Sequence, residues 1–465
     1  MSQRFTSAIL LIGLAFITLS ATIDLDNLFN YADQNIPVYI TKDNTGTNIL
    51  DDKVATLGRV LFYDTNLSSN NTISCAGCHQ QEFAFGDPAT VSTGLSGEFT
   101  GRHSMRLINA RFSDEVQFFW DERASSLEVQ TTMPIQDHVE MGFSGNDGDP
   151  DINDLISHLG TLPYYADLFS FAFDSNEITE EKMQIALAQF VRSIQSFDSP
   201  FDEGLTQTNG NIQANFPNYT AEENLGKNIF LAPPPQGGAG CVSCHRAPEF
   251  DIGPNALNNG VITVAGDPDA IDITNTRAPS LRDVFGQNGT LNGPLMHDGS
   301  FTTMLDVINH YNAIPNDPQN TNLDPRLRPN GQPQNLNLTE LEKEALIVFL
   351  KTLTGNNVYT NEKWSNPFEN DGSITIVGGS LGINSTTGNN NFEMYPNPAT
   401  SVLTILLAED NYDITLFNAL GQVVKRKAAS GSTALNIEAL TSGIYFVAVQ
   451  NLNKNILLQK QLIVK

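Results

Sequence analysis

The sequence predicts a mostly α-helical protein made of two similar units, followed by a small all-β domain of the sandwich type. Three observations predict this. Two stretches share the same order of features: an LG pair, a Phe at the same offset, a loop and a CxxCH pentapeptide. Helix-capping pairs and apolar stripes at helical spacing accompany both stretches. Beyond residue 390 the apolar residues alternate as they do in short strands.

The N-terminal 21 residues predict a secretory signal peptide. Arg4 is followed by an apolar run over residues 8–19 and by the small residues Ser20 and Ala21. The run is too short to span a bilayer comfortably, and the flanks are those of a cleaved leader. A buried first helix is the alternative. The signal peptide predicts export to the periplasm.

Composition limits the partners. The 465 residues, 40% of them apolar, allow several soluble domains. The chain has 25 basic and 52 acidic residues and a formal charge of -27, which repels nucleic acid and anionic lipid. No other segment is typical of a transmembrane helix, so we expect no nucleic acid partner and no membrane span in the mature protein.

The first unit is predicted over residues 22–215 and contains the LG pair at Leu57. The stretch 178–197 places five apolar residues on one helical face, which indicates a core helix. These residues are Met183, Leu187, Phe190, Ile194 and Phe197.

The second unit is predicted over residues 216–357. Thr220 and Glu223 form a capping-box pair at the start of one helix. Thr339 and Glu342 do the same for a second helix, which we expect to stop near Gly355.

Residues 358–390 are rich in Asn, Gly and Ser and predict a linker. Residues 391–465 contain short alternating segments separated by turn residues, such as TSVLTILL and SGIYFVAVQ. This spacing favours a small β-sandwich.

The two CxxCH pentapeptides, CAGCH at Cys75 and CVSCH at Cys241, use all four cysteines. A CxxC pair is a redox centre, a zinc ligand pair or, when His follows at once, an attachment site for haem. A redox centre of the thioredoxin type needs a βαβ context that neither motif has, and zinc needs four ligands in tetrahedral geometry. Covalent haem is therefore favoured at both motifs. Cys75, Cys78 and His79 would hold one haem, and Cys241, Cys244 and His245 the other, so the two units become cytochrome c-like haem domains.

Three further stretches carry a specific resemblance: FFWDERASSLEVQTTMPIQDHVEMG, NTRAPSLRDV and GPLMHDGSFTTMLDVINHYN. They resemble the bacterial dihaem cytochrome c peroxidase family, including its MauG-like branch, over most of residues 50–355. The resemblance implies a peroxidatic first haem domain and an electron-transferring second one. It also implies that Trp120 bridges the haems for electrons, that Gln130 positions the oxygen ligand, and that Glu140 moves a proton between the peroxide oxygens. A carboxyl group suits this role because O–O cleavage requires a proton on the leaving oxygen.

The resemblance also implies distal ligands. Fourteen residues after His297, where the peroxidase branch has Met, this chain has Tyr311, as the MauG-like branch does. A phenolate ligand would lower the haem potential that Met raises. The neighbouring His310 is the alternative ligand. At the first haem Leu95 occupies the position of a distal His, so we expect a five-coordinate iron that is ready for peroxide.

The family binds calcium between its haem domains, and the carbonyl positions match Asn292 and Pro294. The family's Asn ligand is replaced by His103, and imidazole is a poor ligand for so hard a cation. The resemblance thus implies calcium at Asn292 and Pro294, with one ligand position changed at His103.

The stretches YPNPATSVLTI and LTSGIYFVAV resemble the sorting domain of the type IX secretion system. This resemblance implies the secretion machinery as a partner and the cell surface or the exterior as destination. A β-sandwich that binds carbohydrate or packs on the enzyme is the alternative.

The sequence thus predicts a dihaem peroxidase that reduces hydrogen peroxide to water with electrons from a small c-type cytochrome or copper protein. A MauG-like enzyme that oxidises a protein or a small organic molecule is the first alternative. A dihaem electron-transfer cytochrome without enzymatic activity is the second.

Overall fold

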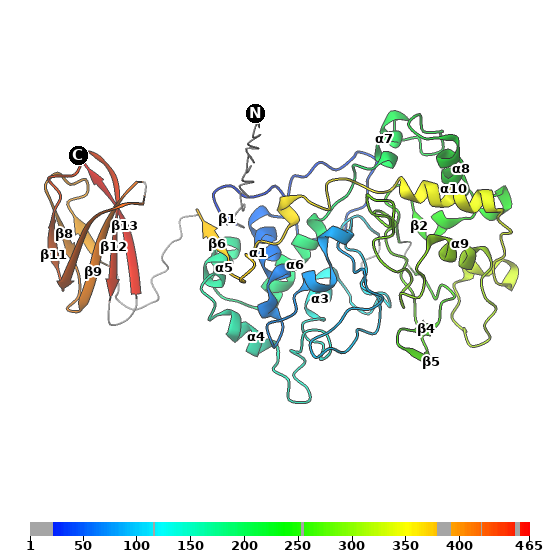
Figure 1. Cartoon of the computed structure of the whole chain (residues 1–465), viewed down its shortest axis with the longest axis horizontal. Coiled ribbons are helices and arrows are strands. Elements are labelled where there is room, and N and C mark those ends of the chain that lie inside the picture. The colour runs from blue at the N-terminus through cyan, green and yellow to red at the C-terminus, as the bar shows by residue number, and fades with distance from the viewer. Residues whose placement is uncertain (1–21, 115–116, 253–254, 379–391, 420, 452–455) are drawn as a thin grey trace, which may run out of the picture. The chain divides into compact units, whose positions relative to one another are not determined.

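The computed structural model describes residues 22–114, 117–252, 255–378, 392–419, 421–451 and 456–465. The predicted signal peptide lies outside the described residues. The chain divides into two compact units, Met1–Gly378 and Gly379–Lys465. Figure 1 shows the helices gathered in the first unit and a β-sandwich in the second.

The helices of the first unit are α1 (Asp52–Tyr63), α2 (Cys75–Cys78), α3 (Leu127–Thr132), α4 (Ile152–Leu159), α5 (Tyr165–Phe173), α6 (Glu180–Ser193), α7 (Pro200–Gln207), α8 (Ala221–Leu231), α9 (Met304–Asn312) and α10 (Glu340–Lys351). Its short strands are β1 (Thr22–Asp24), β2 (His245–Arg246), β3 (Asp251–Ile252), β4 (Thr263–Val264), β5 (Asp267–Ile271) and β6 (Thr375–Val377). Only 27% of the described residues are helical. "Mostly α" therefore describes the cores, because long loops make up much of the first unit.

The first core forms where α1 packs against α6. Gly58 makes this contact possible, since a Cβ built at this position would lie 2.0 Å from the carbonyl oxygen of Ala186. The second core repeats the arrangement with α8 and α10, where a Cβ at Gly226 would lie 1.9 Å from the carbonyl oxygen of Ala345. The glycines of the two LG pairs are thus equivalent points of close helix contact, in agreement with the predicted duplication.

The helix α6 ends earlier than its apolar stripe predicts. Ile194 is its C-cap with extended backbone, and Phe197 lies beyond the helix. Asn109 takes over the backbone bonding here, because its N–H donates to the Ile194 carbonyl at 3.0 Å and its Oδ1 accepts from the Ser196 N–H at 2.9 Å. Both capping boxes of the second core are confirmed, at Thr220 and at Thr339.

The boundaries of the two cores differ from those predicted. The second core begins at Phe201 in α7 and not near residue 216. Residues 358–377, predicted as linker, return to the first core. There Val358 and Trp364 are buried, and β6 pairs in parallel with β1.

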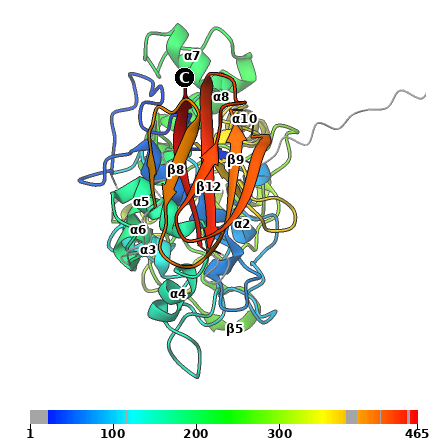
Figure 2. The ribbon, with the colours of Figure 1, turned by 90° about the vertical axis from the view of Figure 1, so that its left-hand side faces the viewer.

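The second unit is a sandwich of two antiparallel sheets. Its strands are β7 (Glu393–Tyr395), β8 (Val402–Leu406), β9 (Asn411–Asn418), β10 (Val423–Ser430), β11 (Thr433–Asn436), β12 (Gly443–Asn451) and β13 (Ile456–Val464). The strand orders are β10-β9-β12-β13 and β11-β8-β7. Figure 2 shows these strands running side by side. The predicted all-β C-terminal domain is present.

Candidate active site

The two CxxCH motifs each line a cavity of the first unit. Cys75, Cys78 and His79 line the first, which has a volume of about 480 Å³. Cys241, Cys244 and His245 line the second, which has a volume of about 170 Å³. All four cysteines are free thiols, so both pairs are available for thioether bonds.

Each motif histidine is prepared to bind a metal through Nε2. The Nδ1 atom of His79 lies 3.2 Å from the carbonyl oxygen of Phe85, and that of His245 lies 3.0 Å from the carbonyl oxygen of Pro279. Burial lowers the pKa of His79 and lowers that of His245 to about 4. Neutral imidazoles whose Nδ1–H donates to a carbonyl keep the Nε2 lone pair free for iron.

Arg106 and Trp120 line both cavities. The Nε of Arg106 is buried and has no hydrogen-bond partner among the described residues. An unpaired guanidinium N–H between two cavities suits a carboxylate group such as haem carries. Together with the thiols and histidines, this donor set fits one c-type haem in each cavity.

The predicted distal residues meet in the first cavity. Gln130, from α3, and Glu140, from the turn after it, both line this cavity with His79. The Glu140 N–H donates to Asp137 Oδ1 at 3.0 Å, which fixes the turn. Burial, followed by the charge of Asp137, raises the pKa of Glu140 to about 7. A carboxyl group with this pKa both accepts and donates a proton near neutral pH.

Leu95 lies beside this turn, since its N–H donates to the Val139 carbonyl at 2.8 Å. A leucine side chain has no lone pair with which to ligate iron.

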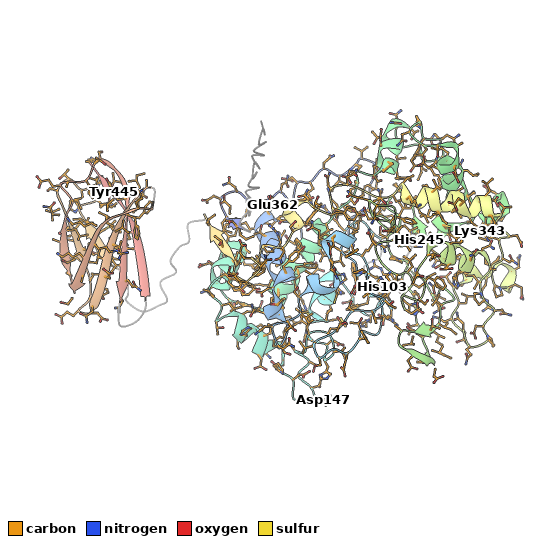
Figure 3. All side chains as sticks on the ribbon, in the orientation of Figure 1. His103, Asp147, His245, Lys343, Glu362 and Tyr445 are labelled. Carbon is orange, nitrogen blue, oxygen red and sulfur yellow. The ribbon has the colours of Figure 1, made fainter. Side chains whose placement is uncertain are left out.

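Two hydrogen bonds hold Trp120 in place, one from its side chain and one to its backbone. Its Nε1–H donates to the His103 carbonyl at 2.6 Å, and its own carbonyl accepts from the Arg277 N–H at 2.7 Å. Figure 3 shows His103 near the middle of the unit and His245 nearer the α8–α10 end. The Trp120 side chain thus belongs to the lining of both cavities and is fixed by its bond to His103.

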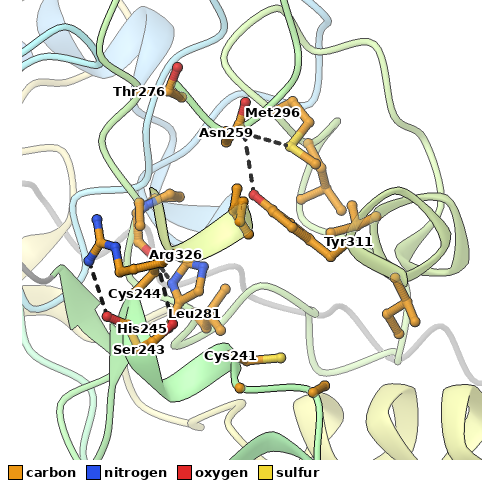
Figure 4. A pocket seen from close by; sticks show the side chains of 18 of the residues that line it. Cys241, Ser243, Cys244, His245, Asn259, Thr276, Leu281, Met296, Tyr311 and Arg326 are labelled. Atoms are coloured by element: carbon orange, nitrogen blue, oxygen red, sulfur yellow. Dashed lines mark hydrogen bonds between the residues drawn. The ribbon is translucent and has the colours of Figure 1, made fainter. Parts of the chain in front are cut away.

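Tyr311, from α9, lines the second cavity (Figure 4). Its Oη accepts from Asn259 Nδ2 at 3.3 Å, and the same amide lies 3.5 Å from the Met296 sulfur. Burial raises the pKa of Tyr311 above its usual value. His310 does not line this cavity, and its Nε2 lies 3.0 Å from the Asn259 carbonyl.

Residues 52–210 match the family model of the di-haem cytochrome c peroxidases. The methylamine utilization protein MauG of Methylorubrum extorquens is 31% identical over 310 residues, which cover 65% of this chain and 78% of that protein. The chain belongs to the di-haem cytochrome c peroxidase family. It is a cytochrome c peroxidase-like haem oxidoreductase, and its family implies two c-type haems.

Other members of this di-haem family are similar over the same region. The cytochrome c551 peroxidase of Nitrosomonas europaea is 28% identical over 310 residues. The aligned region covers 65% of this chain and 80% of the peroxidase. The crystal structure of a MauG-like protein associated with microbial copper homeostasis has 28% identity and a TM-score of 0.57. The superposed region covers 72% of this chain and 99% of the MauG-like protein's chain.

Residues 393–465 match the secretion system C-terminal sorting domain, as the sequence predicts. This domain indicates export by type IX secretion to the cell surface or the exterior. Among the described residues, no helix is long and apolar enough to cross a membrane.

The calcium site stays a prediction. Asn292 uses its Nδ2 to donate to the Asp283 carbonyl at 2.8 Å and to Tyr359 Oη at 3.1 Å. The imidazole Nδ1 of His103 lies 3.1 Å from the carbonyls of Ala89 and Thr90. No group of three or more His, Cys, Asp or Glu side chains suited to a metal occurs in the described part of the chain.

The sequence analysis missed Arg106, Met296 and Asn259. Met296 directly precedes His297 in a stretch already singled out, so its place beside the second cavity was detectable. Arg106 and Asn259 had no such sequence signal, because their roles depend on contacts between distant loops.

Proposed function

We propose that this enzyme reduces hydrogen peroxide to water at the first cavity, with electrons that enter through the second haem. The observation that carries the proposal is Glu140, a half-buried carboxyl group whose pKa is raised to about 7 and which shares a cavity with His79 and Gln130. A carboxyl group with this pKa is ionised often enough to take a proton and protonated often enough to return it.

Haem attached at Cys75 and Cys78 would supply the iron that binds peroxide and the electrons that reduce it. Glu140 accepts the proton of the near peroxide oxygen and delivers it to the far one, which leaves as water. Gln130 orients the bound oxygen from α3. Leu95 offers no ligand, so the distal side stays open to peroxide.

Trp120 transfers electrons from the second cavity to the first. The support is its position on the lining of both and the 2.6 Å hydrogen bond that fixes its ring. The external donor in this proposal is a small c-type cytochrome or copper protein.

A MauG-like oxidation of a protein or small organic substrate is the second candidate. Tyr311 favours it, because a phenolate ligand lowers the potential of the second haem and hinders its reduction by an ordinary donor. The MauG of Methylorubrum extorquens is also among the similar proteins.

Steady-state turnover of the holoenzyme with peroxide and a reduced small c-type cytochrome distinguishes the peroxidase from the MauG-like enzyme. Continuous oxidation of the cytochrome supports the peroxidase. A long-lived oxidised state that the cytochrome does not reduce supports the MauG-like alternative, and no reaction with peroxide contradicts both.

A further inference from the structure

Two tyrosines share one buried carboxylate at the end of α1. Asp64 is 2% exposed, and its Oδ2 accepts hydrogen bonds from Tyr164 Oη and Tyr165 Oη, each at 2.7 Å. Its Oδ1 accepts from the backbone N–H and the amide of Asn66 at 2.8 and 2.7 Å. The buried Asp202, by contrast, is paired with Arg282 at 2.7 Å. In the described part of the chain, Asp64 is held by neutral donors, and only the two phenols among them can give it a proton.

The inner tyrosine belongs to the core against which the first haem-attachment cysteine packs. Tyr165 is fully buried in the first core, and Cys75 packs against that core. Burial, followed by the carboxylate of Asp64, raises the pKa of the Tyr165 phenol. Phe62, on α1 and in the same core as Tyr165, lines the first cavity.

The outer tyrosine leads to the surface. The ring centroid of Tyr164 lies 4.7 Å from that of Tyr165, and Tyr164 is only half-buried. Figure 1 shows α5, which begins at Tyr165, beside α1. The pair thus connects the core behind Cys75 with solvent.

We propose that Tyr165 and Tyr164 form a second exit for oxidising equivalents, which lets small phenols be oxidised at the surface beside Tyr164. This inference rests on the proposed reaction of peroxide at the first cavity. The juxtaposition of a buried phenol in the core against which Cys75 packs, an outer phenol in ring contact and a carboxylate bonded to both carries it.

Asp64 balances the protons of each step. Tyr165 loses one electron toward the first cavity and its phenolic proton to Asp64 Oδ2, because an oxidised phenol is a strong acid. When Tyr164 then gives an electron to Tyr165, Asp64 returns the first proton to Tyr165 and takes the proton of Tyr164. The carboxylate therefore never holds more than one proton, and no buried charge is left uncompensated.

The substrate regenerates Tyr164. A phenol at the surface gives one electron to Tyr164 and its proton to solvent, and leaves as a phenoxyl radical. Asp64 returns its proton to Tyr164 and is a carboxylate again, and the first cavity takes up one proton from solvent for each electron it receives. Two phenols are oxidised for each peroxide, which yields two phenoxyl radicals and two waters. The net charge of -27 disfavours anionic substrates, so the preferred class is neutral or cationic phenols.

Rapid-freeze electron paramagnetic resonance of the holoenzyme after one equivalent of peroxide tests this inference. We expect a tyrosyl radical whose hyperfine structure collapses when the protein contains ring-deuterated tyrosine. The signal should be lost in Tyr165→Phe. In Tyr164→Phe it should remain, while phenol oxidation falls at least about tenfold. The matched control is Tyr31→Phe, a fully buried tyrosine of the same core whose Oη donates to the Lys363 carbonyl and not to a carboxylate.

The absorption spectrum of the wild-type haems, recorded with the same samples, separates two failures. A spectrum that changes with peroxide while no tyrosyl radical forms overturns this inference alone. A spectrum that does not change overturns the proposed function together with it. A radical that survives in Tyr165→Phe but disappears in Tyr31→Phe also overturns the inference.

Discussion

The indole of Trp120 donates to the backbone carbonyl of His103 at 2.6 Å, and this bond fixes the ring on the lining of both cavities. The His103 N–H in turn donates to the His297 carbonyl at 2.8 Å. Trp120 is therefore anchored to the loop before the second cavity's helix α9 through one bond from its side chain and one backbone bond. Such anchoring suits a residue whose distance from two redox centres must not vary.

Trp120→Phe should slow peroxide-dependent oxidation of a reduced cytochrome at least about tenfold, which corresponds to about 1.4 kcal/mol in activation free energy. The reason is the loss of both the indole and its anchoring bond. Stopped-flow reduction of the first haem through the second measures the step. The control is Trp364→Phe, because this other tryptophan donates to Ser193 Oγ and lines neither cavity. Equal rates in wild type and Trp120→Phe would exclude the bridge.

The rate constant for the reaction with peroxide should rise with pH through about 7. Burial raises the pKa of Glu140 to that value, and only the ionised carboxylate can take the first proton from peroxide. The protonated form dominates below the pKa, so the rate is lost as the pH falls. Stopped-flow mixing with peroxide from pH 5 to 9 measures the profile, and a flat profile would contradict the assignment of Glu140.

Tyr311→Met should raise the reduction potential of the second haem, since a thioether favours ferrous iron more than a phenolate does. Tyr311→Phe should leave that haem with an open distal position and a high-spin spectrum. Spectroelectrochemistry and electron paramagnetic resonance measure both. His310→Gln is the control, because His310 does not line the second cavity. If the spectra changed in His310→Gln and stayed the same in Tyr311→Phe, His310 and not Tyr311 would be the distal ligand.

Substitution of either glycine of the LG pairs by alanine should lower the free energy of unfolding of the first unit by about 1–3 kcal/mol. The reason is that the added methyl group overlaps a backbone carbonyl of the facing helix. Denaturant unfolding of Gly58→Ala and Gly226→Ala measures the loss. Gly160→Ala is the matched control, since its nearest neighbour would lie at 3.4 Å. A loss no larger than the control's would remove these glycines as the explanation of the repeat.

The features that the sequence predicts correctly are local. The capping boxes at Thr220 and Thr339 and the strand alternation of the last domain each depend on residues a few positions apart. The LG repeat was visible in the sequence, but its cause was not, because the contact of Gly58 with Ala186 joins helices far apart in the chain.

The features that escaped prediction depend on distant contacts. The return of residues 358–377 to the first core is stabilised by burial of Trp364 and by pairing with β1, which a polar composition does not reveal. Asp64 and Tyr165 lie about a hundred residues apart and meet only through the packing of α5 on α1.

Replacement of Glu140 by Gln tests the central claim most directly. The amide keeps the size of the side chain but cannot transfer the proton, so peroxide turnover should fall by about 10²- to 10⁴-fold while both haems stay attached. The control is Glu98→Gln, the same change at an exposed residue that does not line the cavity. Peroxide turnover by Glu140→Gln equal to that of wild type and Glu98→Gln would contradict the account.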